Sequence, residues 1–404
     1  MLKERFLTYV KIHTTSCEDS SASPSSQRQF DLAQVLKEEL LEMGLEDVEV
    51  SDQCIVTASL PGNGKETFGL IAHMDTAPDY SGENVQPQII ENYDGSAIDL
   101  KGASISMDPK DFPDLKDLVG KTLITTDGTT LLGADDKAGV AEIMEVIQYF
   151  VDHPDLDRPN LKVAFTPDEE VGRGTENFDV SSFACDYALT VDGGSLGEFS
   201  TENFNAASAK VTINGLNIHP GSAKDQMINA LDIACDYHQS LPVAQRPQHT
   251  EGHEGFIHLH TMEGTVEEAS LNYIIRDFFS ESFQEKKDLM TKLASFMEEK
   301  YQTKIQVDIT DSYYNMSDKL SHVSFLKEAV IQAMKDNDVK PALLPIRGGT
   351  DGAVLSYKGL PCPNLFTGGH HFHGRFECIA LEDMEAAVEV LISLIKALGK
   401  RKTA

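Results

Sequence analysis

The sequence has no long apolar run and a marked deficit of positive charge. No stretch approaches the 18 consecutive apolar residues of a transmembrane helix, and the opening "MLKERFLTYVKIHTT" lacks the apolar core of a signal peptide. Lys and Arg number 34 against 65 Asp and Glu, and the net charge of −31 argues against binding to nucleic-acid backbones or anionic membranes. We therefore expect a cytoplasmic protein that binds neither.

Cysteine is scarce and forms no C-x-x-C pair. The absence of paired spacing argues against a disulfide framework and against a thiolate zinc site, so we expect buried free thiols. The six positions are Cys17, Cys54, Cys185, Cys235, Cys362 and Cys378.

The length of 404 residues exceeds what one hydrophobic core usually supports, which favours two domains. Up to about residue 205, short β-branched runs alternate with longer helical patterns, as in an α/β domain with a largely parallel sheet. Residues 206–311 instead follow the order β-α-β-β-α-β, a ferredoxin-like arrangement, after which the α/β pattern returns. We therefore predict a discontinuous domain of residues 1–205 and 312–404, interrupted by a domain of residues 206–311.

The stretch "LLGADDKAGV" places two carboxylates before a helical apolar stripe that begins at Val140. Asp135 or Asp136 could simply cap that helix, where a carboxylate is worth about 1 kcal/mol. Either could instead belong to a catalytic site. Lys137 beside them is expected to be a surface charge of the helix.

Metal-ligand residue types follow several predicted strands. In open α/β sheets ligands bind beyond the carboxyl ends of strands. Each residue has an ordinary alternative: a core histidine, a solvated acidic face, a turn aspartate or a flexible loop. Taken together, however, converging carboxylates repel one another unless cations neutralise them. The residues are His73, Asp75, Asp135, Asp136, Asp168, Glu169, Glu170, Asp192, His370, His371 and His373.

Imidazole and carboxylate ligands without thiolates suit zinc or a similar divalent ion in a catalytic site. There are enough of them for two metals that share one bridging carboxylate. The adjacent acids of "TPDEE" would then supply one ligand and one free general base.

The ordered motifs resemble the M20 family of zinc peptidases along the whole chain, and within it they are most similar to tripeptide aminopeptidases. The resemblance implies a di-zinc exopeptidase that removes the N-terminal residue of tripeptides, with a lid or dimerisation domain and a homodimeric assembly. An M20 dipeptidase, carboxypeptidase or acylamino-acid deacylase is the alternative in this fold, and a non-catalytic binding relative is the alternative outside enzymes. The motifs are "HMDTAPD", "GADDKAG", "TPDEEVGRG", "TVDGG", "GLNIHPG", "YIIRDF", "IRGGTDGA" and "HFHGRFE".

The resemblance also implies a role for each site residue. His73 and Asp192 would bind the first zinc, Glu170 and His373 the second, and Asp135 would bridge them. Asp75 would orient His73 by accepting its second ring N–H. Glu169 would be the general base. His371 is the alternative to His373, and the peptide bond between Asp135 and Asp136 is expected to be cis, with Asp136 left as the helix cap.

Three further residues are candidates for substrate binding. His219 in "NIHPG" would reach the active site of a partner subunit, or would be an exposed turn residue. Arg276 and Arg347 could clamp the peptide carboxylate bidentately, or could be a strand-surface ion pair and a loop cation. His253 is expected to be incidental.

Overall fold

The computed structural model describes residues 1–401, which form two compact units. The first unit comprises Met1–Thr201, Asp318–Leu344 and the chain from Thr350 onward. The second comprises Glu202–Ser317 and a short return segment, Pro345–Gly349. That return segment carries Arg347, which the sequence-based boundaries place in the first domain.

The first unit is built on an eight-stranded mixed sheet with the order β1-β2-β8-β3-β9-β16-β10-β15. Its centre, from β8 through β3 and β9 to β16, is parallel, while β1 and β2 are antiparallel additions at one edge. Residues of β3 are almost wholly buried, as expected for a parallel strand covered on both faces. The strands are β1 (Glu46–Val50), β2 (Val56–Leu60), β3 (Thr67–His73), β8 (Asn160–Thr166), β9 (Tyr187–Gly193), β10 (Glu198–Ser200), β15 (Ala342–Leu343) and β16 (Asn364–Phe366).

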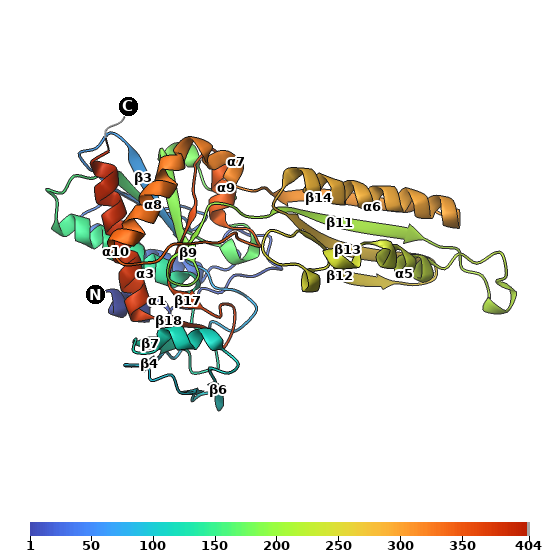
Figure 1. The fold of residues 1–404 in the computed structure, drawn as a ribbon, viewed down its shortest axis with the longest axis horizontal. Coiled ribbons are helices and arrows are strands. Elements are labelled where there is room, and N and C mark those ends of the chain that lie inside the picture. The colour runs from blue at the N-terminus through green and yellow to red at the C-terminus, as the bar shows by residue number, and fades with distance from the viewer. Residues whose placement is uncertain (402–404) are drawn as a thin grey trace. The chain divides into compact units, whose positions relative to one another are not determined.

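Helices cover this sheet and complete one large apolar core (Figure 1). Among them α3 contacts β3 and β9 and also packs against α1 and α10. This enclosure explains why α3 is buried on nearly all sides rather than along one stripe. The helices of the unit include α1 (Leu2–Tyr9), α2 (Gln29–Glu42), α3 (Ala134–Asp152), α4 (Val180–Phe183), α8 (Ser324–Asp336), α9 (Asp351–Tyr357) and α10 (Leu381–Gly399).

A smaller four-stranded sheet, β17-β18-β7-β4, and a β5-β6 hairpin form a satellite core in the same unit. Their strands span only two or three residues each, too few for a periodic pattern to predict them. They are β4 (Gln88–Ile90), β5 (Ile98–Leu100), β6 (Ile105–Met107), β7 (Leu123–Thr125), β17 (Gly369–His370) and β18 (Cys378–Ala380).

The second unit has the predicted β-α-β-β-α-β order, with an antiparallel sheet in the order β12-β13-β11-β14. Helices α5 and α6 pack against this sheet and against each other around a separate apolar core. The elements are β11 (Asn205–Asn214), α5 (Ala230–Ser240), β12 (Phe256–Gly264), β13 (Glu268–Asp277), α6 (Ser280–Tyr301) and β14 (Ile305–Tyr313). The predicted fold class, an α/β domain interrupted by a ferredoxin-like domain, is confirmed.

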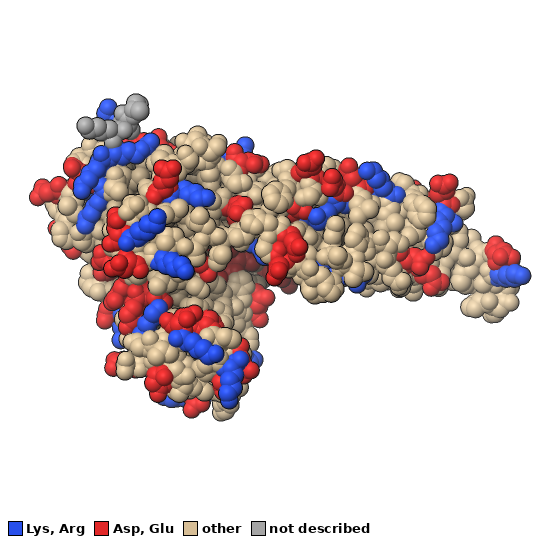
Figure 2. Space-filling view, in the orientation of Figure 1, with Lys and Arg blue, Asp and Glu red and all other residues tan. Residues whose placement is uncertain are grey.

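Surface properties agree in part with the sequence. Within residues 1–401, no helix is both long and apolar enough to cross a membrane. Figure 2 shows acidic side chains dispersed over the visible face, with lysines and arginines among them. Cys54, Cys362 and Cys378 are buried thiols as expected, but Cys17 and Cys235 are exposed, so the expectation of burial was wrong for those two.

Candidate metal centre and active site

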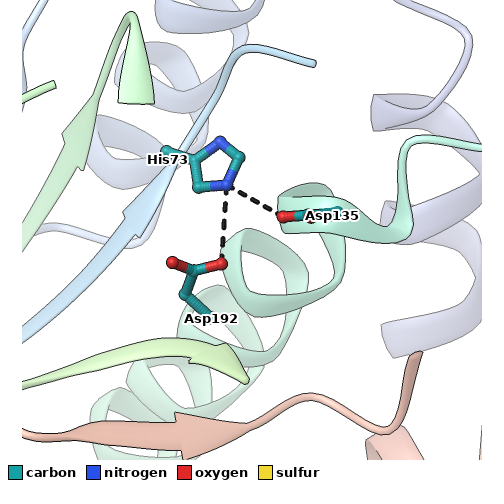
Figure 3. A group of neighbouring side chains, drawn as sticks. All are labelled: His73, Asp135 and Asp192. Carbon is teal, nitrogen blue, oxygen red and sulfur yellow. Dashed lines mark hydrogen bonds and ion pairs between the residues drawn. The ribbon is translucent and has the colours of Figure 1, made fainter. Parts of the chain in front are cut away.

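The first candidate metal group lies at the carboxyl ends of two neighbouring parallel strands (Figure 3). His73 ends β3, and Asp192 lies near the end of β9. The Nε2 atom of His73 lies 3.0 Å from Oδ1 of Asp135 and 3.5 Å from Oδ1 of Asp192. The imidazole is buried, so its ring nitrogen faces two carboxylates with little water between them.

The second candidate group shares one member with the first. Nε2 of His373 lies 3.3 Å from Oδ2 of Asp135 and 3.0 Å from Oε2 of Glu170. Asp135 therefore presents one carboxylate oxygen to each group. In both groups the potential ligand atoms lie within 4.8 Å of one another.

These donor sets fit divalent cations. A tetrahedral ion with bonds of about 2.0–2.2 Å has ligand atoms roughly 3.3–3.6 Å apart, close to the spacing between the nitrogens and oxygens here. In addition, Oε1 of Glu170 is buried with no hydrogen-bond partner among the described residues. A buried carboxylate oxygen without a partner is costly unless a cation or a proton satisfies it.

The electrostatics of the site are also compatible with a bound cation. Burial raises the pKa of Glu170 to about 7, with a further contribution from Asp135. Hydrogen bonds with Asp135 and Glu170 raise the pKa of His373 to about 11. Burial acts to lower the pKa of His73, but Asp192 and the hydrogen bonds to its carboxylate neighbours raise it well above 6.5. These shifts favour the protonated imidazoles, and a bound cation would compete with those protons.

Asp75 connects the first group to the predicted general base. Its wholly buried carboxylate accepts the backbone N–H of Glu169 at 3.0 Å and that of Glu170 at 3.2 Å. Its Oδ1 lies 3.4 Å from Nδ1 of His73, while the Asp75 carbonyl oxygen lies closer to that nitrogen, at 3.1 Å. One residue thus contacts the second ring nitrogen of His73 and holds the turn that carries both glutamates.

Glu169 lies in a short 3-10 turn, Glu169–Val171, which begins three residues after the end of β8. Burial raises the pKa of its carboxyl well above the ordinary value, although His73 acts to lower it. The preceding Asp168 has a positive φ of 58° and is fully buried. Its carboxylate accepts from the backbone N–H and hydroxyl of Ser25 at 2.7 and 2.5 Å, and from the side-chain amide of Gln29 at 2.7 Å.

The two acids of "GADD" have different environments. The Asp135–Asp136 peptide bond is cis, which confirms that expectation. Asp136 turns away from the metal groups: Oδ1 accepts the N–H of Gly139, as a helix cap does, and Oδ2 accepts the N–H of His73, each at 3.2 Å. The expectation for Lys137 was wrong, because its side chain is buried and Nζ donates to the carbonyl of Ile12 at 2.7 Å. Neighbouring segments enclose α3 at this end, so the Lys137 side chain does not reach the surface.

The three histidines of the last loop separate into two sets. Nδ1 of His370 and Nε2 of His371 lie 2.9 and 3.0 Å from the carboxylate of Asp114, and the ring of His371 packs against Phe112. Only His373 of the three belongs to a candidate metal group within the described residues. This geometry supports the choice of His373 over His371.

The substrate-binding candidates all lie in the second unit. His219 is exposed, and its Nδ1 accepts the N–H of Gly221 at 3.1 Å, as a local turn residue would. The guanidinium of Arg276 lies 5.2 Å from the ring of Tyr313 and makes no ion pair within residues 1–401, so the strand-surface ion pair is not formed.

Arg347 is held by the loop at 250–254. Its guanidinium donates to the carbonyls of Gly252 and Glu254 at 2.5 and 3.1 Å and to Oγ1 of Thr250 at 3.0 Å. His253 in that loop pairs with Glu202 at 2.8 Å, which agrees with an incidental role. The carboxylate-clamp roles of Arg276 and Arg347 stay predictions.

Two supporting residues were not singled out from the sequence as site residues. Asp351, at the start of α9, accepts the hydroxyl of Thr166 at 2.8 Å, and burial raises its pKa to about 7. Glu377 accepts three backbone N–H groups of the loop that leads to Asp135. Both lie inside motifs that the sequence displays, "GGTDGA" and "HGRFE", but their partners are remote in the chain.

Comparison with known proteins agrees with this arrangement. A family model described as the peptidase dimerisation domain matches residues 201–304. A peptidase T of Caldanaerobacter subterraneus is 51% identical over 403 residues, covering 98% of each chain. The crystal structure of aminopeptidase PepT from Bacillus cereus superposes with a TM-score of 0.79 at 20% identity, covering 99% of this chain and 98% of that one.

A dinuclear metal-binding peptidase of the M20 family from Bacillus subtilis shares the fold more distantly, with a TM-score of 0.67 at 12% identity over 98% of each chain. The match at 51% identity extends over nearly the full length of both chains, so it includes every motif of the candidate site as well as the inserted domain. The chain belongs to the peptidase T family of M20 metallopeptidases.

Proposed function

We propose that this chain is a tripeptide aminopeptidase that holds two zinc ions and hydrolyses the first peptide bond of tripeptides. The observation that carries the proposal is the shared carboxylate of Asp135, which faces His73 with one oxygen and His373 with the other and belongs to both ligand groups. Such an arrangement suits two ions bridged by one ligand. In this proposal Asp135 bridges, His73 and Asp192 complete the first site, and Glu170 and His373 complete the second.

A pair of zinc ions would supply a water whose pKa is lowered to about 7 and would polarise the scissile carbonyl. Glu169 would take the proton of the attacking water on its carboxylate and deliver it to the amine that leaves. A carboxyl whose pKa is raised by burial suits this role, because it can hold the proton between the two transfers.

Asp75 would fix the geometry of this proton transfer without itself contacting the reacting atoms. Its carboxylate accepts both glutamate N–H groups, so it holds the general base and the ligand Glu170 on one turn. It would also accept the Nδ1 proton of His73, leaving Nε2 of that ring free to bind metal.

For the substrate, we propose that Arg276 or Arg347 meets the peptide carboxylate and that His219 stabilises the oxyanion from a partner subunit. The second unit, residues 206–311 in the sequence-based division, would be the lid and dimerisation domain of a homodimer. The family match to a peptidase dimerisation domain supports this assembly. We further propose that the protein acts in the cytoplasm on short peptides.

Comparing a tripeptide, a dipeptide and an N-acetyl amino acid as substrates tests the function. We expect cleavage of the tripeptide at its first bond, loss of activity on chelation and recovery with zinc. Glu169→Gln should lower kcat by about 10²–10⁴-fold, the typical contribution of a general base. Preference for the acylated substrate would favour a deacylase, and full activity of the Glu169→Gln variant would exclude the proposed mechanism.

A further inference from the structure

Glu377 occupies an unusual position between two parts of the candidate metal centre. It lies four residues after His373, immediately before β18, and its side chain is 1% exposed. Its Oε2 accepts the backbone N–H groups of Leu132 and Gly133 at 2.7 and 2.8 Å, and its Oε1 accepts that of Asp135 at 3.0 Å. All three of these hydrogen bonds go to the loop that carries the shared ligand.

The loop that carries Asp135 belongs to no strand and to no regular helix. It lies between β7 and the regular part of α3, and Gly133 adopts a positive φ of 83°. Successive N–H groups that point inward from such a turn form a concave site for an anion. Removing the carboxylate would leave buried N–H groups unpaired, each at a cost that the loop can avoid only by changing its conformation.

The two metal groups depend on this contact to different degrees. In the first group, His73 and Asp192 lie on β3 and β9, whose positions are set by the central sheet. In the second group, Asp135 and His373 lie on the two segments that Glu377 joins, and only Glu170 stands outside them. Loss of Glu377 would thus affect two of three ligands in the second group but only one in the first.

We propose that Glu377 is a positioning residue that fixes the position of the bridging Asp135 relative to His373. In this role it is needed specifically for binding of the second metal ion. The inference rests on the proposed di-metal function. Glu377 contacts neither substrate nor metal in this role. It acts through the backbone of the ligand loop.

The test is the metal stoichiometry and affinity of the full-length protein, stripped with chelator and titrated with Zn²⁺ by equilibrium dialysis. Wild-type protein should bind two ions. Glu377→Gln should bind the first with near-normal affinity and the second about 10–100-fold more weakly, the usual effect of losing a residue that supports a ligand. Glu382→Gln is the matched control, because Glu382 also accepts a backbone N–H, that of Thr122 at 2.8 Å, at an exposed site.

If Glu377→Gln does not fold by circular dichroism, Glu377→Asp serves instead, since it keeps the charge but shortens the reach by one methylene. Two ions bound with wild-type affinities by the folded variant would overturn the inference, as would equal weakening of both ions. Failure of the wild-type protein to bind two ions would instead refute the proposed function, so the two failures are distinguishable.

Discussion

The buried carboxylate of Asp168 anchors the turn that carries Glu169, and its hydrogen bonds set the magnitude of a first prediction. Three donors, two from Ser25 and one from Gln29, converge on this carboxylate at 2.5–2.7 Å. In Asp168→Asn one oxygen becomes an NH₂ group that cannot accept, so at least one charged hydrogen bond is lost and one buried donor is left facing another. Hydrogen bonds to charged groups contribute about 1.5–3 kcal/mol each, and we expect the stability to fall by about that amount.

The same substitution should reduce catalysis, because Asp168 directly precedes the predicted general base. A shift of the turn moves Glu169 relative to the metal groups, and small misplacements in active sites can cost up to about 10²-fold in rate. The assays are thermal unfolding and kcat for tripeptide cleavage at saturating zinc. We expect a lowered Tm together with a lowered kcat.

Asp179→Asn is the matched control. Asp179 also accepts several donors, the backbone N–H groups and hydroxyls of Ser181 and Ser182, but it caps α4 at the surface. We expect it to lose at most about 1 kcal/mol, the usual value of a helix cap, and to keep its kcat. If Asp168→Asn matched this control in both Tm and kcat, the assignment of Asp168 as the anchor of the turn would be refuted.

Two further predictions concern other buried groups. Burial raises the pKa of Glu142 well above its ordinary value, and neither carboxylate oxygen has a partner among the described residues. The folded state therefore holds this proton at pH values where the unfolded state, with a pKa of about 4.3, releases it, so this group's contribution to stability is lost as pH rises above about 4.3. The difference in Tm between Glu142→Gln and wild type should therefore be more favourable to the variant at pH 8 than at pH 5. An equal difference at both pH values would contradict the pKa shift. Separately, His373→Ala should abolish binding of one zinc ion while His371→Ala retains both, and the reverse pattern in dialysis would show that the ligand lies two residues earlier.

The sequence predicted the cluster at the strand ends because that placement follows from topology. Parallel strands end at one sheet edge, so His73 at the end of β3 and Asp192 near the end of β9 must lie close together once the strand order is known. The ferredoxin-like order of the inserted domain could also be predicted, because each of its strands and helices is long enough to show its hydrophobic periodicity.

Other features depend on tertiary contacts that no local pattern contains. Lys137 has the sequence context of an exposed helix residue, and only the enclosure of α3 by its neighbours buries it. Glu377 and Asp168 act on the backbones of remote segments, at 242 and 143 residues of separation for two of these bonds. Nearly every residue type carries a backbone N–H, so the type of a residue does not indicate whether its N–H donates to a remote carboxylate. Such partners therefore cannot be predicted from side-chain types.

Anomalous diffraction from crystals of the zinc-loaded protein would locate the bound ions directly. We expect two peaks about 3.5–4 Å apart on either side of the Asp135 carboxylate, one beside His73 and Asp192 and the other beside Glu170 and His373. A single peak at full zinc occupancy, or two peaks that do not share Asp135, would refute the proposed di-metal site.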